Sequence, residues 1–157
     1  MKRVPGAWLL VTVVVGLLAA CGPVRKSVFP PLVSVQQLHL GSDAQWHMQL
    51  RIQNNSYQGV KFTHVLLDMQ VHGTPAGTLD TPINLDIPPL SVDVAEVRLT
   101  PSARAAKALA AGGESVPYQL TGTLEGTPDE GGKSRTFKVH SEQHWLSPMP
   151  GIPDTWR

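Results

Sequence analysis

His140 and His144 have the spacing that most readily indicates metal chemistry, because two histidines four residues apart share one face of a helix. Their surroundings predict an extended strand instead, in which four residues span about 13 Å, too far for one zinc ion. No cysteine or acidic triad completes a site with them. The sequence therefore predicts surface histidines and no metal.

Serine, histidine and aspartate side chains are all present, but the patterns that make them catalytic are missing. The sequence has no Gly-x-Ser-x-Gly motif to present a nucleophilic serine, and no glycine-rich loop that opens a helix. Cys21 is the only cysteine, so the chain has no partner for a disulfide. We therefore predict no catalytic residue, no cofactor and no enzymatic activity.

Cys21 has a different chemistry, which its N-terminal surroundings indicate. Two cations at Lys2 and Arg3 precede an apolar run from Ala7 to Leu18, and the run ends in Leu18-Ala19-Ala20-Cys21. This arrangement resembles the lipobox of bacterial lipoproteins, with residues 1–20 as the signal peptide. The apolar run is shorter than the roughly 20 residues of a membrane span. A plain signal peptide or an uncleaved anchor remains the alternative.

The lipoprotein resemblance implies that the Cys21 thiol takes a diacylglycerol, that the bond before it is cut, and that the new amine is acylated. Two or more acyl chains hold a protein at a membrane far longer than one does. Residue 22 is Gly, not the Asp that usually retains such proteins in the inner membrane. The predicted location is therefore the outer membrane, facing the periplasm. A Gram-positive source would instead place the protein on the outer face of the plasma membrane.

The mature chain would lose two of its 13 Lys and Arg residues and keep all 12 Asp and Glu, leaving one net negative charge. Its longest basic cluster is the pair Arg25-Lys26, so no nucleic-acid partner is predicted. Residues 21–31 contain three prolines and form a predicted tether that reaches at most about 35 Å. The partners predicted here are the membrane, through the lipid, and an envelope protein.

Alternation of apolar and polar residues predicts strands through most of the remaining chain. It is unbroken over Trp46–Gln53, where Trp46 and three further apolar residues should face a core. The same pattern recurs over 65–71, followed by a predicted hairpin turn at 72–75. In the segment 92–99 the alternation slips by one residue at Ala95-Glu96, which predicts a bulge or a twist. Further strand patterns cover 116–124 and 137–139, with a turn at 128–132 between them.

One short helix is predicted at about residues 101–111. Thr100 is the expected N-cap, Pro101 suits the first helical position, and Gly112-Gly113 would end it. Its apolar face is narrow, so it should lie over one end of the sheets. The whole pattern predicts an all-β fold, an immunoglobulin-like or fibronectin-III-like antiparallel β-sandwich over residues 32–144. A carrier of lipids or small molecules would need a deep apolar cavity between its sheets.

The order of these segments, with certain residues, resembles the LEA type 2 family, whose members carry a WHy (water stress and hypersensitive response) domain. The resemblance spans about residues 33–141. Its carriers are the following stretches: Leu50 to Tyr57 with Asn54 and Asn55, Val71 to Gly77 with Gly73, Ile87-Pro88, and Tyr118 to Leu124 with Gly122. Asn54 stands where the family's proline is expected. The resemblance implies a sandwich without a catalytic site, associated with desiccation and other stress.

The segment 145–157 is rich in proline yet carries Trp145 and Trp156. It is interpreted as a strap across the sandwich, or alternatively as a docking peptide for a partner. The sequence therefore predicts a non-enzymatic, membrane-anchored LEA type 2 lipoprotein that protects the envelope under stress. The alternative is an envelope adapter or assembly lipoprotein that binds another protein through a sheet edge or this tail.

Overall fold

The computed structural model describes residues 26–157, so the predicted signal peptide, Cys21 and the first half of the tether lie outside the described residues. Nine strands and one helix follow in the order β1 (Leu32–Leu40), β2 (Trp46–Gln53), β3 (Val60–Val71), β4 (Thr74–Ile87), β5 (Val92–Leu99), α2 (Ala103–Ala111), β6 (Val116–Pro128), β7 (Arg135–His140), β8 (His144–Leu146) and β9 (Thr155–Trp156). No helix in the described part of the chain is long and apolar enough to span a membrane.

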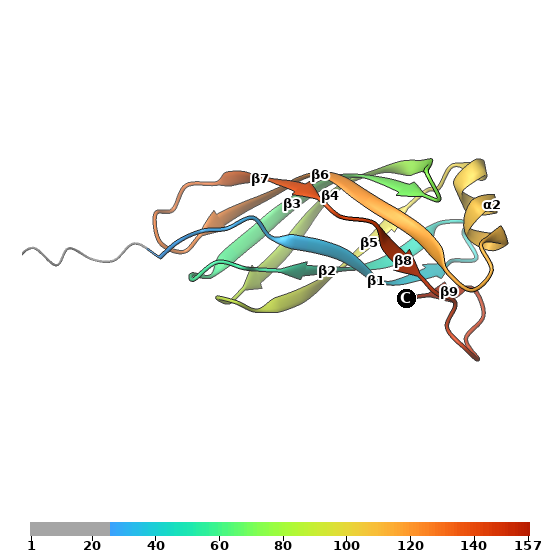
Figure 1. Cartoon of the computed structure of the whole chain (residues 1–157). Helices are drawn as coiled ribbons and strands as arrows, with labels where there is room; N and C mark the ends of the chain where they lie inside the picture. The colour runs from blue at the N-terminus through green and yellow to red at the C-terminus, as the bar shows by residue number, and fades with distance from the viewer. Residues whose placement is uncertain (1–25) are drawn as a thin grey trace, which may run out of the picture.

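The strands form two antiparallel sheets that pack face to face (Figure 1). One sheet has the order β5-β2-β1-β9. The other has the order β4-β3-β6-β7, and β8 also pairs with β6. The predicted all-β antiparallel sandwich with one short helix is confirmed.

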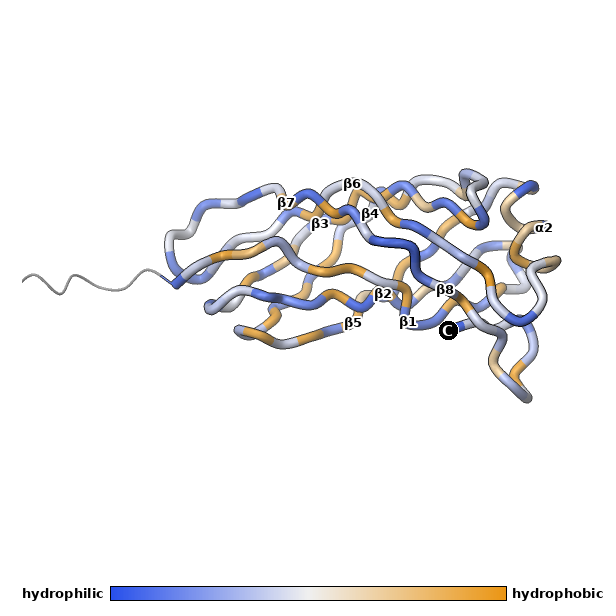
Figure 2. Tube along the Cα trace, in the orientation of Figure 1, coloured by the Kyte–Doolittle hydropathy of each residue, from blue (hydrophilic) through white to orange (hydrophobic). Residues whose placement is uncertain are grey.

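Alternating burial places one face of each sheet in the core. In β2, the side chains of Trp46, Met48, Leu50 and Ile52 are almost completely buried, as predicted, and the polar residues between them are half-buried. β3 and β6 repeat the pattern in the facing sheet. Along the traces in Figure 2, hydrophobic and hydrophilic residues accordingly alternate within the long strands. Side chains fill the space between the sheets, as in an ordinary sandwich core.

The predicted bulge in β5 is wrong. β5 pairs with β2 in unbroken register from Trp46 opposite Leu99 to Gln53 opposite Val92. Val97 and Leu99 face the core together with the small Ala95, while Val92 is exposed. The apparent slip arose because Val92 and Val94, which alternate with the buried residues of β5, were counted as core residues. Register shifts occur instead in β1, at residues 35–37, and in β3, at residues 62–64 and 69–70.

The helix α2 covers one end of the sandwich, as predicted, with Ala105 and Leu109 buried (Figure 1). Its N-cap, however, is Ser102 and not Thr100. The Ser102 hydroxyl accepts a hydrogen bond from the Ala105 N–H (3.2 Å) and donates one to the Pro75 carbonyl (2.7 Å). Ser102 therefore caps the helix and fixes it to the start of β4 at once, which a cap at Thr100 would not do.

The connections between the strands gather at two opposite ends of the sandwich (Figure 1). At the entry end, the chain arrives from residue 26 beside the β2–β3, β4–β5 and β6–β7 connections (Figure 1). At the opposite helix end lie α2, the β1–β2 turn, the β3–β4 hairpin and the loop before β9.

Candidate functional site

Asn54 organises the entry end. Its side chain is buried, and the amide donates hydrogen bonds to the carbonyls of Gln58 (2.9 Å) and Ile87 (3.0 Å), with Pro88 O also within 3.1 Å. Its Oδ1 accepts from the Ser56 N–H (2.9 Å), which tightens the β2–β3 connection as an Asx turn. One side chain thus joins the β2–β3 and β4–β5 connections.

The place of Asn54 does not suit a proline. Its backbone N–H donates to the Ser91 carbonyl at 2.9 Å, and proline would remove both this bond and those of the side chain. Asn55 has a different role, because it is only half-buried and contacts the incoming chain through the Pro30 carbonyl (3.3 Å). The two asparagines that the resemblance pairs are therefore not equivalent.

Gln58 connects the incoming chain to the β6–β7 connection. It is buried, its Nε2 donates to the Lys26 carbonyl (2.8 Å), and its Oε1 accepts from the Glu130 N–H (2.8 Å). The side chains of Lys26 and Glu130 pair at 3.1 Å above it, both about half exposed. These contacts line a groove of about 890 Å³ that also contains Lys133 and Arg135. The first described residues are thereby held firmly against the sandwich.

Apolar side chains that the sequence analysis did not single out are exposed around Asn54. Phe29, Tyr57 and Leu90 have exposed fractions of 44%, 56% and 64%. The rings of Phe29 and Tyr57 meet edge to face, with centroids 5.9 Å apart. For Tyr57 and Leu90 the sequence signal was a single apolar residue in a connection, between polar or proline neighbours, whereas Phe29 follows Val28 and precedes two prolines.

The two glycines of the resemblance are required by the backbone. Gly73 has φ of 71° and, with His72 at 50°, forms the turn of the predicted hairpin; the turn has two residues and not the expected four, because Thr74 and Pro75 already pair with β3. Gly122 lies in the middle of β6 with φ of 150°. A Cβ on Gly122 would approach the Leu66 carbonyl oxygen to 2.1 Å and Leu67 Cα to 3.0 Å on β3. Gly122 therefore allows β6 and β3 to approach closely.

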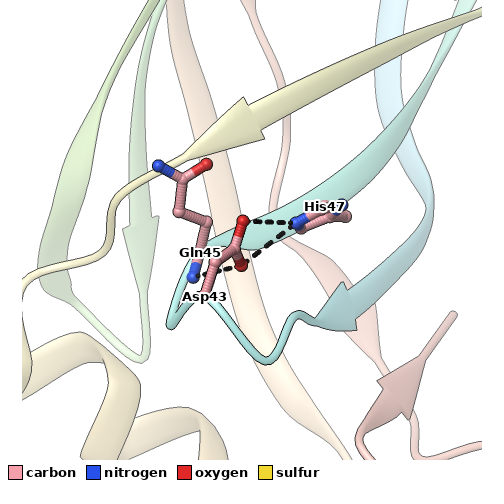
Figure 3. Close-up of polar contacts among 3 residues, drawn as sticks. All are labelled: Asp43, Gln45 and His47. Carbon is pink, nitrogen blue, oxygen red and sulfur yellow. Dashed lines mark hydrogen bonds and ion pairs between the residues drawn. The ribbon is translucent and has the colours of Figure 1, made fainter.

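An acid–imidazole pair occupies the β1–β2 turn at the helix end (Figure 3). The Asp43 carboxylate accepts from the Gln45 N–H (3.1 Å) and lies 3.1 and 3.2 Å from His47 Nε2. The Gln45 N–H, followed by His47, lowers the pKa of the Asp43 carboxyl below its usual value. Both side chains are well exposed, so this pair fixes a turn in which Ala44 has a positive φ.

His140 and His144 are not in one strand, so the distance argument made for them from the sequence does not apply. His140 ends β7 and His144 begins β8, and both border a cavity of about 460 Å³ with Arg51 and Glu142. The His144 ring stacks on the Tyr118 ring at 5.5 Å. Across residues 26–157 there is no cluster of three or more metal-ligating side chains.

The C-terminal segment connects the two sheets. β8 pairs with β6, placing Trp145 opposite Pro117, and β9 pairs with β1, placing Trp156 opposite Leu38. Backbone hydrogen bonds between Ser147 and Arg157 close the intervening loop. Despite its prolines the segment thus contains two short strands. Trp145 is 56% exposed, whereas Trp156 packs against the core.

No protein-family model matches the chain, and no curated protein matches it in sequence. Solved structures with a similar chain path include a solution structure from Arabidopsis thaliana, with a TM-score of 0.48, 11% identity, and coverage of 86% of this chain and 88% of that chain. A crystal structure from Archaeoglobus fulgidus has a TM-score of 0.42 and 13% identity, covering 78% of this chain and 98% of that chain.

A solution structure of a proposed late embryogenesis abundant (LEA) protein has a TM-score of 0.45 and 15% identity, covering 91% of this chain and 85% of that chain. At these values the likenesses concern the general chain path and say nothing about function.

Proposed function

We propose that this chain is a non-enzymatic bacterial lipoprotein, anchored through Cys21 in the outer membrane and facing the periplasm, whose sandwich protects envelope components under water stress. The observation that carries the proposal is the lipobox-like sequence ending at Cys21, only five residues before Lys26, whose carbonyl is bonded to Gln58 of the sandwich. Five residues span at most about 18 Å. The entry end of the sandwich would therefore be held close to the membrane.

The use of the buried polar side chains supports a non-catalytic module. The side chains of Asn54 and Gln58 make hydrogen bonds to backbone groups and thereby join the connections at the entry end. Ser141, also buried, donates its backbone N–H to Leu120 O and accepts from the Leu120 N–H through Oγ. Groups engaged in this way maintain the fold and are not free to bind or activate a substrate. The stress role itself rests on the LEA type 2 resemblance of the sequence.

An envelope adapter is the second candidate, and the free sheet edges favour it. The edge strand β4 carries Pro75 and Pro82, which hinder the addition of another strand. β5, one of the two edge strands of the other sheet, contains no proline. A partner strand could therefore add beside β5, and the exposed Trp145 offers a second contact at the tail.

Three forms of the full chain test the anchor. In cells of the native host, the wild type should carry acyl groups on its N-terminal residue and fractionate with the outer membrane. Gly22→Asp should move the acylated protein to the inner membrane, and Cys21→Ser should abolish acylation. An unmodified thiol at Cys21 in the wild type would refute the lipoprotein proposal.

The role is tested by comparing survival of drying in cells that produce each form. Stress protection predicts that survival falls with Cys21→Ser and with removal of the protein. Crosslinking in the same cells separates the two candidates. A single stoichiometric partner that is lost with Cys21→Ser would favour the adapter. If no partner is crosslinked and survival of drying is nevertheless impaired in the variants, stress protection is favoured.

A further inference from the structure

We propose that Phe29, Tyr57 and Leu90 form a membrane-inserting tip that holds the sandwich upright on the phospholipid surface. The inference rests on the proposed lipid anchor and goes beyond it. The anchor alone would keep the entry end near the bilayer but leave the tilt of the sandwich free, whereas the tip fixes which residues of this end contact the bilayer.

The three side chains belong to one rigid surface, although they come from three separate segments. Ser56 is buried between these segments: its hydroxyl accepts from the Phe29 N–H (2.9 Å), and its carbonyl accepts from the Leu90 N–H (3.2 Å). The Tyr57 N–H donates to the Ser27 carbonyl (3.1 Å). Since the backbone is fixed at each position, the three points from which the exposed side chains project are set before any contact is made.

Leu90 is the clearest sign that this surface has a purpose other than stability. It has φ of 53°, in the left-handed region where glycine or asparagine is the usual residue. Its side chain is also the most exposed of the large apolar side chains in the described chain, at 64%. A leucine here strains the backbone and contributes little to the core. Strain of this kind is characteristic of contact and ligand-binding sites.

The path of the chain identifies the occupant as a lipid surface. The predicted anchor residue Cys21 is five residues from Lys26, and Lys26 is bound to Gln58 beside the tip. The tip therefore cannot lie far from the bilayer that holds the acyl chains. Aromatic rings with a polar atom, such as that of Tyr57, favour the interface between headgroups and acyl chains. In Figure 2 the β4–β5 connection is hydrophobic at its two ends with a pale stretch between them, while the β6–β7 connection, on the other side of this end, is mainly hydrophilic.

The charges near the tip indicate apolar insertion and not electrostatic attraction. Lys26 is already paired with Glu130, and Lys133 and Arg135 in the same groove are close in sequence to Asp129. Both signs of charge are therefore present at this end. Insertion should occur on uncharged phospholipids as well as on anionic ones, and it should resist salt.

A thiol label tests the tip, because acylation of Cys21 leaves the wild type without a free thiol. The full-length variant Leu90→Cys and the control Ala110→Cys, on an exposed position of α2 at the helix end, are purified from membranes and labelled with a polarity-sensitive fluorophore. Both are reconstituted into phosphatidylcholine vesicles that contain nitroxide-labelled lipids. The label at position 90 should emit at shorter wavelength and be quenched by the nitroxides, and the label at 110 should not.

Each other outcome overturns a defined part of the inference. Uptake of label by the wild type would show a free Cys21 and refute the anchor, and the tip with it. If the wild type takes up no label but the two variants are quenched equally, or not at all, the anchor stands and the tip alone is refuted. Quenching at position 90 that requires phosphatidylglycerol and disappears in salt would replace apolar insertion by charge attraction.

Discussion

Tyr118 and Val35 join the two sheets through a hydrogen bond. Tyr118 lies on β6, yet its phenolic oxygen accepts from the backbone N–H of Val35 on β1, at 2.8 Å. The residues are buried and 83 positions apart in sequence. The register of β1 against β2 shifts just after Val35. At this bulge the Val35 N–H therefore points toward the facing sheet and not toward a neighbouring strand of its own sheet.

Replacing Tyr118 with phenylalanine should destabilise the fold by about 1–3 kcal/mol, because the Val35 N–H then loses its partner in a buried place. Chemical unfolding of the two proteins measures the difference. Tyr57→Phe is the matched control, since the Tyr57 side chain is 56% exposed and its hydroxyl can bond to water. Equal stability of Tyr118→Phe and wild type would mean that water or a shift of β1 satisfies the Val35 N–H.

The same tyrosine should make the protein sensitive to alkali. Burial raises the pKa of Tyr118 above its ordinary value of 10.0, although the bond from Val35 opposes the shift. The unfolded chain therefore releases this proton at lower pH than the folded chain does. The contribution of Tyr118 is complete below pH 10.0 and is lost as pH rises through the folded pKa. Denaturant midpoints measured on both sides of that value should decline less in Tyr118→Phe, and identical declines would contradict the assignment.

Asn54→Asp should be severely destabilising, by about 3 kcal/mol or more, because a carboxylate would face the carbonyls of Gln58 and Ile87 in a buried site. Burial and these carbonyls raise the pKa of the new carboxyl. The variant should therefore recover stability as pH falls and the carboxyl gains a proton that it can donate. Urea unfolding at neutral and acid pH measures both effects. Asn55→Asp, at a half-buried neighbour, should change stability little and shows whether a new charge alone explains the loss.

A backbone position can require glycine because its φ is positive or because a Cβ would have no room. Gly122→Ala and Gly73→Ala separate these two reasons. Both positions have a positive φ, but only Gly122 lacks room, since a Cβ there meets the Leu66 carbonyl oxygen. At Gly73 no atom lies within 4 Å of the added carbon. Gly73→Ala should cost about 1–2 kcal/mol from conformation alone. Gly122→Ala should cost more than about 3 kcal/mol, because β6 must move away from β3. Similar losses in the two variants would show that β6 yields easily.

The sequence predicted most of the sandwich because burial here follows the period of two. Trp46–Gln53 matches β2 residue for residue, and the hairpin at Gly73 needs only a two-residue turn with positive φ. The errors occurred where tertiary contacts override local pattern. The Ser102 hydroxyl bonds to Pro75 O as well as to the helix, and the bulge in β1 lies beside Val35, whose N–H bonds to Tyr118. Neither neighbour is visible to a local analysis.

The features of the entry end were predictable only in part. A motif resemblance indicated Asn54, but the bonds from Asn54 to Ile87 join residues 33 positions apart, so its role needed the fold. The exposed residues Phe29, Tyr57 and Leu90 come from the incoming segment and from the β2–β3 and β4–β5 connections. Each of them is unremarkable in sequence, and only folding brings the three together.

Deleting residues 147–157 distinguishes a strap from a docking peptide. The deletion removes β9 from the edge of β1, together with the bonds from the Leu40 N–H to Asp154 O (2.9 Å) and between His39 Nδ1 and Thr155 Oγ1 (2.9 Å). We expect a loss of about 2–4 kcal/mol in unfolding free energy, since several buried hydrogen bonds and the packing of Trp156 disappear. The exposed edge of β1 should also promote self-association, which sedimentation measures. Trp145→Ser, which changes an exposed side chain and keeps the strands, should leave stability unchanged. If the truncated chain kept its full stability and instead lost a crosslinked partner, the tail would be a docking element and the adapter function would gain support.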